Sequence, residues 1–470
     1  MRRTIEREIK LAVGEGFVLP ELGTPQPQRL FLSTYFDTPD LRLARAGVTL
    51  RHRVEDGTGR WQLKLPHGAS RLELELPGPP ARVPAPMLEL LVAHARGEHL
   101  VAVARLRTRR ESIRVNGAEV VEDAVSVLQG VHVTRRFREL EVELLEGDEE
   151  TLRRLEKQLR RAGATDASQV PKLYRALDLA GPVEPFVAPP DAAPREALAI
   201  AIREQTRRML VHDPGTRLGE DIEDLHQLRV ATRRLRAYLR AARPIVDREW
   251  AEELRAELGW LGAALGPARD LDVLVARLEE DVAGLDADEE AGRRLIEGLQ
   301  RERMTARDAV VEALSSERYL ALLDRLEGLA VDAVPPGRKD VSLRGLARRE
   351  LRRTRRAAAS LSAEPADAEL HDLRIRAKRV RYALELAEHE LGRKGARAIR
   401  AAKAVQDVLG EHQDSTVAEE RVRALAAAVP ELGLAAGRIV DRERARRAAA
   451  RATWRDAWRR FESRARSAVS

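Results

Sequence analysis

Acidic and basic residues occupy alternate positions in several short segments near the start of the chain. Glu6, Glu8 and Lys10 do so in one segment, and Glu141 and Glu143 do so in another. Residues two apart in a β-strand point to the same face, so this spacing would gather the side chains on one surface. Carboxylate oxygens suit a hard divalent cation, and lysine and arginine suit phosphate. Such a surface could bind a phosphate anion together with a metal and activate water.

The alternating segments predict the strands that would carry these side chains. In an ordinary half-buried sheet, the polar face is exposed to water. Here side chains of both charges occupy the whole of one face in strand after strand, which is unusual. Eight antiparallel strands can close into a barrel that holds one small ligand, so we expect an eight-stranded antiparallel β tunnel barrel with a charged lumen. The eight segments lie near residues 5–10, 29–36, 48–54, 61–65, 72–76, 105–115, 117–125 and 133–144.

A second group of candidate residues lies on a predicted helix that occurs twice, over 225–240 and 370–385. At about 100° per residue, the basic residues of each copy share one stripe beside an apolar stripe. A second repeated pair, 265–270 and 409–414, has nearly the same spacing, which indicates a duplicated helical bundle. The basic stripe comprises His226, Arg229, Arg233, Arg236 and Arg240 in the first copy and His371, Arg374, Lys378 and Arg381 in the second.

The two basic stripes are not interleaved with the acidic residues that usually pair with arginine on a solvated helix. Such a surface repels itself unless an anion lies against it. If two bundles place their stripes opposite one another, they form a positively charged channel that suits a linear polyanion. Glu385 stands where the first copy has Arg240, so the second stripe is shorter.

Composition and proline content indicate how these parts are organised. We expect an α+β multidomain protein with a tunnel domain over 1–180, a Pro-rich linker over 181–194 and a helical domain over 195–470. The helical domain would consist of one bundle over 195–330 and a second over 343–470.

The chain has 470 residues, and its 83 basic and 76 acidic residues give a net charge of only +7. It contains no cysteine, which excludes disulfides and thiolate metal sites. No segment approaches the roughly 18 apolar residues of a membrane span, and the charged start is unlike a signal peptide. We therefore expect a cytoplasmic protein that does not bind membranes.

The ordered charged motifs of the first part resemble the CYTH domain of the triphosphate tunnel metalloenzymes. They are Glu6-x-Glu8-x-Lys10, Tyr35 to Asp40, Arg51-x-Arg53, Lys64, Glu73-x-Glu75, Asp123, Glu141-x-Glu143 and Lys172. The resemblance implies catalysis by Glu6, Glu8 and Lys10, and Mg²⁺ or Mn²⁺ held by Glu6, Glu8, Asp123, Glu141 and Glu143. It also implies that Lys10, Arg51, Arg53, Lys64 and Lys172 bind triphosphate, joined by Arg107, Arg109 or Arg110. Glu73 and Glu75 could hold a second metal or position water.

The paired His-x-x-Arg helices of the second part resemble the CHAD domain, a helical module similar to known polyphosphate binders. Arg269-Asp270 and Gln406-Asp407 belong to the same resemblance. It implies that inorganic polyphosphate binds to the two stripes and to the first helix of each repeat, where Arg203 and Arg207 correspond to Arg348 and Arg352.

The combined expectation is a metal-dependent triphosphatase joined to a polyphosphate-binding module. Inorganic triphosphate is the preferred substrate because no aromatic slot for a base is evident, but thiamine triphosphate and nucleotides stay open. One alternative is a non-enzymatic protein that binds polyphosphate and localises to polyphosphate bodies. Nucleic-acid binding is a weaker alternative, because only 3% of the residues are aromatic and could stack on bases.

Overall fold

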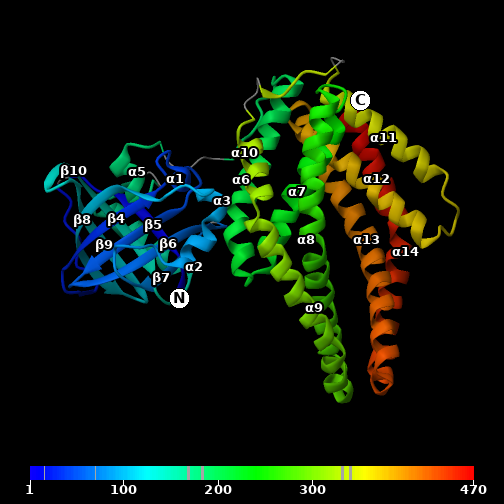
Figure 1. Cartoon of the computed structure of the whole chain (residues 1–470), viewed down its shortest axis with the longest axis horizontal. Coiled ribbons are helices and arrows are strands. Elements are labelled where there is room, and N and C mark those ends of the chain that lie inside the picture. Colours follow the sequence, from blue (N-terminus) through cyan, green and yellow to red (C-terminus); the bar gives the residue numbers. More distant parts are fainter. Residues whose placement is uncertain (15, 69, 167–169, 181–184, 330–332, 338–340) are drawn as a thin grey trace. The chain divides into compact units, whose positions relative to one another are not determined.

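The chain divides into two units, Met1–Glu184 and Pro185–Ser470. The computed structural model describes all residues except 15, 69, 167–169, 181–184, 330–332 and 338–340 (Figure 1). The first unit is an antiparallel β-sheet domain with short helices, and the second consists of long helices (Figure 1). This confirms the predicted order of a β domain followed by a helical domain. Of the predicted linker, residues 181–184 lie outside the described residues, and residues 185–193 contain neither helix nor strand.

Within the part of the chain that the structure describes, the sheet has eleven strands in the order β1-β7-β6-β5-β4-β8-β9-β10-β2-β11, with β3 paired to β8. The strands are β1 (Arg2–Glu6), β2 (Glu8–Ala12), β3 (Thr24–Pro25), β4 (Arg29–Asp37), β5 (Thr49–Glu55), β6 (Thr58–His67), β7 (Ser70–Pro77), β8 (Val101–Val115), β9 (Ala118–Gln129), β10 (His132–Leu144) and β11 (Thr165–Asp166). The short helices of this unit are α1 (Arg42–Arg45), α2 (Ala85–Leu90), α3 (Val92–Ala95), α4 (Glu149–Arg161) and α5 (Lys172–Leu177).

The strand count exceeds the predicted eight for local reasons. The two-residue strands β3 and β11 have no counterpart in the prediction, and the first predicted strand is divided at Arg7 into β1 and β2. These two strands pair with β7 and β10 respectively, which lie far apart in the order of the sheet. Among the described residues, the hydrogen-bond ladder does not join the two ends of the sheet, so the closure of the sheet into a barrel remains a prediction.

The apolar residues of the strands are covered by helices, which leaves the charged residues for the other face. Leu11 and Leu140 are fully buried and form one core with Leu155 and neighbouring leucines of α4. Helix α4 begins where the Asp148 side chain accepts a hydrogen bond from the Thr151 backbone N–H, at 3.1 Å. Burial of these leucines stabilises the sheet and fixes which way the alternating charged side chains point.

The second unit contains nine long helices among the residues that the structure describes. They are α6 (Pro194–Leu218), α7 (Ile222–Ala242), α8 (Arg248–Val282), α9 (Glu289–Ser315), α10 (Glu317–Glu327), α11 (Leu343–Ala359), α12 (Asp367–Leu386), α13 (Glu388–Ala428) and α14 (Gly433–Val469). Helix α13 is kinked at Gly392, where φ is 53° and ψ is −140°. None of the described helices combines the length and the apolar character needed to cross a lipid bilayer.

The repeated segments occupy corresponding helices, α7 and α12, which pack against each other. The rings of Tyr238 and Tyr382 meet edge to face with their centroids 6.4 Å apart. Farther along, α13 and α14 form a long hairpin (Figure 1), and these helices share an apolar core with α8 and α9 that includes Leu278 and Ile439. The two repeats therefore share packing surfaces, and the boundary between two separate bundles stays a prediction.

Candidate functional site

Charged side chains from most strands of the sheet line one cavity of about 310 Å³ in the first unit. Strand alternation and antiparallel pairing bring together residues that are far apart in the sequence. Helix α5 also lines the cavity and contributes Lys172. The predicted site residues that line it are Glu6, Glu8, Lys10, Arg51, Arg53, Lys64, Glu73, Glu75, Glu141, Glu143 and Lys172.

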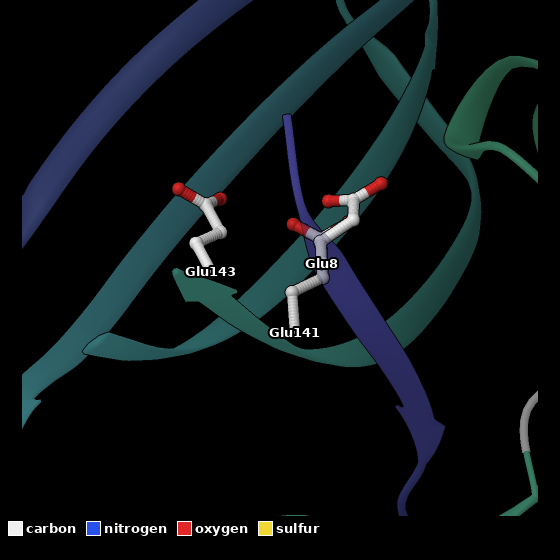
Figure 2. Close-up of side chains that lie close together, drawn as sticks. All are labelled: Glu8, Glu141 and Glu143. Atoms are coloured by element: carbon white, nitrogen blue, oxygen red, sulfur yellow. The ribbon is translucent and has the colours of Figure 1, made fainter. Parts of the chain in front are cut away.

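Three carboxylates converge within this cavity. Glu8, Glu141 and Glu143 each offer one oxygen, and these oxygens lie within 4.8 Å of one another (Figure 2). The register of β2 and β10 explains the arrangement, because Glu143 lies directly opposite Glu8 and Glu141 lies two residues before it. Burial raises the pKa of Glu143 to about 6, with Glu141 adding repulsion against the pull of Arg110. An all-carboxylate set of this kind fits Mg²⁺ or Mn²⁺.

Two other predicted metal ligands lie in ion pairs outside this cluster. Glu6 accepts a hydrogen bond from Lys64 Nζ at 2.5 Å. Asp123 is completely buried and accepts two hydrogen bonds from Arg110, at 2.9 and 2.8 Å, while Lys172 Nζ lies 3.0 Å away. Burial would raise the pKa of Asp123, but Lys172 and Arg110 outweigh burial and lower it. The structure therefore places Glu6 and Asp123 as partners of cations.

Two lysines flank Glu141. Lys10 Nζ lies 2.5 Å and Lys172 Nζ lies 3.0 Å from Glu141 Oε1, and Lys172 is also 2.9 Å from the buried Glu139. Burial would lower the pKa of both lysines, but Glu141 and Glu139 outweigh it and raise both values. The lysines thus stay charged and neutralise the carboxylates of the cavity.

The cavity arginines differ in how well they are paired. Arg51 donates hydrogen bonds to Gln62 at 2.7 Å and to Tyr35 at 3.1 Å. Arg53 is only 9% exposed, and its buried Nε has no hydrogen-bond partner among the described residues. Its guanidinium lies 4.2 Å from the centroid of the Phe31 ring. Burial, with repulsion by Arg51 and Arg110, lowers the pKa of Arg53 to about 9. An anion entering the cavity would relieve this unbalanced charge.

The structure corrects the choice among the arginines of β8. Arg110 lines the cavity, whereas Arg107 and Arg109 are exposed and do not. The reason is strand alternation, since Arg107 and Arg109 lie two apart on one face and Arg110 lies on the other. The cavity also contains cations that we did not predict from the sequence. Two of them continue the alternation of their strands, because Arg60 lies two residues before Gln62 and Arg71 lies two residues before Glu73. Arg2 and Arg29 also line it, without so clear a signal.

In the second unit, the predicted basic stripes meet where α7 packs on α12. Arg233 Nε donates to the Tyr382 hydroxyl at 2.9 Å, which links the two repeats. Burial, followed by repulsion from Arg374, Arg233 and Arg381, lowers the pKa of Lys378 to about 7. This part of the stripe therefore has more positive charge than the neighbouring acidic groups offset.

Each repeat places one stripe arginine against a glycine of the next helix. A Cβ added at Gly266 would lie 3.6 Å from Arg229 Nη2, and one added at Gly410 would lie 3.3 Å from Arg374 Nη2. The repeated Leu-Gly pairs of the sequence therefore admit these guanidinium groups close to the helix backbone. Buried Nε atoms of both arginines have no hydrogen-bond partner among the described residues.

Acidic residues lie beside the same arginines in both repeats. Arg229 Nη2 is 3.4 Å from Asp270, and Arg374 Nη2 is 4.0 Å from Asp414. Arg374 is also influenced by Arg233 and Asp270 of the other repeat, while burial is the main cause that lowers its pKa. The stripe residues of both copies thus share one electrostatic environment.

The remaining predicted polyphosphate ligands have varied surroundings. Burial and then Arg269 lower the pKa of His226, and His371 Nδ1 lies 2.7 Å from Gln413 Oε1. The side chain of Arg236 packs near Gly259, and burial lowers the pKa of Arg240. The outer arginines have other contacts: Arg203 lies 4.3 Å from the Phe186 ring centroid, Arg207 pairs with Glu204, Arg348 donates to the carbonyl groups of Val469 and Ser470, and Arg352 is exposed.

Comparison with known proteins places these two sites in known domains. The CYTH domain matches residues 4–174 and the CHAD domain matches residues 200–423. An uncharacterized protein of Mycobacterium tuberculosis is 31% identical over 463 residues, which cover 89% of this chain and 88% of the relative.

Solved structures match one part of the chain each. The CHAD domain from the plant Ricinus communis is 27% identical and covers 58% of this chain and 94% of its own, with a TM-score of 0.47. HpAC1 from Hippeastrum, described as having a dominant triphosphatase activity, is 20% identical and covers 38% of this chain and 98% of its own, with a TM-score of 0.26. With both domain matches and a relative that spans most of its length, the chain belongs to the family of proteins in which a CYTH domain is followed by a CHAD domain.

Proposed function

We propose that the first unit is a metal-dependent triphosphatase and that the second unit binds inorganic polyphosphate. The observation that supports the enzyme is the convergence of Glu8, Glu141 and Glu143 in a cavity that is also lined by lysines and arginines. Carboxylates alone would repel a triphosphate, and cations alone would bind it without activating water. Inorganic triphosphate is the proposed substrate, and a related organic triphosphate would use the same groups.

We further propose that β1 and β2 act as one strand bent at Arg7, so that the sheet closes around the cavity. This would convert the ladder into an eight-stranded tunnel, because β1 pairs with β7 and β2 pairs with β10. The support is the lining itself, to which β1, β7, β2 and β10 all contribute. A tunnel of this kind would hold the substrate extended and exclude bulk water.

Glu8, Glu141 and Glu143 would hold the metal ion. Glu6 would keep the side chain of Lys64 in place, and Asp123 would do the same for Arg110 and Lys172. Mg²⁺ or Mn²⁺ bound there would neutralise phosphate charge and lower the pKa of a coordinated water. Arg53, with Arg51, would bind phosphoryl oxygens and favour the charge that develops as water attacks the terminal phosphorus in line. The P–O bond to the bridging oxygen breaks, and orthophosphate and pyrophosphate leave.

The lysines would change partners during substrate binding. In the unliganded protein, Lys10 and Lys172 neutralise Glu141, and Lys64 neutralises Glu6. If Glu141 helped to hold a cation, Lys10 and Lys172 would no longer be neutralised by this carboxylate, and their charge would be available for phosphate oxygens. The cavity would thereby couple metal binding to triphosphate binding.

The test is phosphate release from inorganic triphosphate with Mg²⁺ or Mn²⁺. The Glu8→Gln, Glu143→Gln double variant keeps side-chain size and should lose activity by at least about 100-fold. Glu150→Gln, on an exposed position of α4, is the matched control and should retain the parent rate. Equal activity of the double variant and the parent would refute this assignment of the carboxylates.

A non-enzymatic polyphosphate binder is the second candidate, because the stripe of the helical unit has buried, unpartnered guanidinium nitrogens. In that case, triphosphate would not be hydrolysed, while polyphosphate would bind to the parent and bind weakly to an Arg233→Ala, Arg374→Ala variant. Competition with DNA would detect nucleic-acid binding by the same stripe. We propose a cytoplasmic protein associated with polyphosphate bodies, which fluorescence microscopy of the tagged chain can test.

A further inference from the structure

A second cavity, of about 560 Å³, lies in the helical unit and is lined by none of the basic-stripe residues. Helices α6 and α7, the junction between α12 and α13, and residues 186–188 form its walls. The apolar part of the lining includes Ile200, Leu386 and Ile399. It is therefore a site in its own right, separate from the proposed polyphosphate surface.

Most charged groups in this cavity already have protein partners. Glu204 accepts hydrogen bonds from the Phe186 backbone N–H at 3.1 Å and from Arg208 Nε at 3.1 Å. Glu385 accepts from Arg234 Nε at 3.1 Å and from the Tyr238 hydroxyl at 3.2 Å. A ligand would have to displace these contacts to bind the same carboxylates. The groups that remain free are therefore the ones that could bind a ligand directly.

Three groups in the lining have no such partner among the described residues. Gln205 is only 5% exposed, and its Oε1 is buried without a hydrogen bond. The buried Nε2 of His389 also has no partner. Glu388 forms no salt bridge with the described residues, and burial followed by repulsion from Glu385 raises its pKa. An amide oxygen, an imidazole nitrogen and a carboxylate can all accept hydrogen bonds.

One negative charge of the lining is not offset by an ion pair among the described residues. Glu204 pairs with Arg207 and Arg208, and Glu385 pairs with Arg234 and Arg381, which leaves the charge of Glu388. A ligand that donates several hydrogen bonds and carries positive charge would satisfy the free acceptors and balance this charge. An anion would be repelled by Glu388 and would donate no hydrogen bonds to the free acceptors. A small hydrated cation would make no contacts with the apolar wall of the cavity.

We propose that this cavity binds an organic ammonium ion with an aliphatic chain, a linear diamine, with its two ammonium groups at Gln205 and at Glu388. A primary ammonium group has three N–H donors, and the methylene chain would cover Ile200 and Ile399. Leaving the Gln205 oxygen unpaired in a buried site is costly, and the ammonium group would remove that cost. The inference does not depend on triphosphate hydrolysis or on polyphosphate binding.

Calorimetric titration of the full chain with pentane-1,5-diamine tests the proposal. Pentan-1-ol, which has the chain without the charge, and ammonium chloride, which has the charge without the chain, should bind at least about tenfold more weakly. Gln205→Leu and Glu388→Gln should each weaken diamine binding about tenfold or more, since the first removes an acceptor for a charged donor and the second removes the negative charge that attracts it. Glu297→Gln, at an exposed position of α9, is the matched control for nonspecific attraction and should leave binding unchanged.

Two outcomes would overturn the proposal. One is the absence of saturable diamine binding to the parent chain. The other is binding that survives both cavity substitutions or that falls equally in Glu297→Gln. Glu388 is much more open to solvent than Gln205, so Glu388→Gln tests the site even if replacement of the buried Gln205 disturbs folding. Thermal unfolding without ligand identifies such a disturbance.

Discussion

Lys378 should make polyphosphate binding depend on pH, if the proposed basic stripe is the binding surface. Burial and repulsion by Arg374, Arg233 and Arg381 lower its pKa from 10.5 to about 7, against the attraction of Asp414. A bound polyanion would restore the ordinary preference for the charged form. Between pH 7 and pH 9, the charged fraction of the unliganded lysine falls from about one half to about one hundredth, so affinity should fall by up to about fiftyfold.

Anisotropy titrations with long-chain polyphosphate at constant ionic strength would measure this effect, since salt also changes the affinity. Lys378→Arg keeps the charge throughout the range and should bind with little pH dependence. Lys378→Met should bind more weakly, also with little pH dependence. The same pH slope in the parent and in Lys378→Arg, or no slope in the parent, would refute the reasoning.

The same shift affects the stability of the unliganded protein. Between about pH 7 and 10.5, the unfolded chain keeps the Lys378 proton that the folded chain has lost. The unfolded state therefore binds more protons, and this residue makes the free energy of unfolding rise with pH across that window. Below about pH 7, both states are protonated and the contribution no longer changes.

Three further substitutions test the two sites. Arg53→Met should raise the free energy of unfolding in urea, because it removes a buried, poorly paired cation, and should raise KM for triphosphate at least about tenfold. Arg110→Met should lower the free energy of unfolding by about 3 kcal/mol, because Asp123 loses its bidentate partner in a buried site; a loss near zero would contradict the role of that pair. Asp270→Asn should tighten polyphosphate binding about twofold to fivefold, because it frees Arg229 from an exposed ion pair worth less than about 1 kcal/mol; weaker binding would show that the carboxylate positions the arginine instead.

Arg107→Met provides the matched control for Arg53→Met. Arg107 is exposed and lies outside the cavity, so neither KM nor unfolding should change measurably. If both substitutions raised KM equally, the assignment of Arg53 as the unbalanced cation would be wrong. If Arg53→Met lowered stability, its packing on Phe31 would outweigh the cost of its buried charge.

Patterns in the sequence were enough to locate the strands and helices whose side chains follow a single backbone period. The two-residue period of a strand is visible as alternation, so the segments around Glu6 and Glu141 could be recognised and the strands located. The helical period likewise revealed that His226 and His371 open equivalent stripes. These patterns, with the family resemblance, predicted a β domain followed by a helical domain and most of the charged residues that line the first cavity.

Pairing across the molecule required the tertiary structure. The sequence contains five candidate carboxylates for a metal, but only the strand register shows that Glu8 lies opposite Glu143 while Asp123 is held by Arg110. The unpaired state of Arg53 and the lowered pKa of Lys378 depend on burial and on neighbours from distant segments.

The sequence by itself determined which residues are charged and on which face of a strand or helix each one lies, because the backbone period sets that face. It could not determine the partner of each charge, because a partner is chosen by contacts between elements that are far apart in the chain. The electrostatic character of both sites, and the existence of the second cavity, were therefore decided only when those elements packed together.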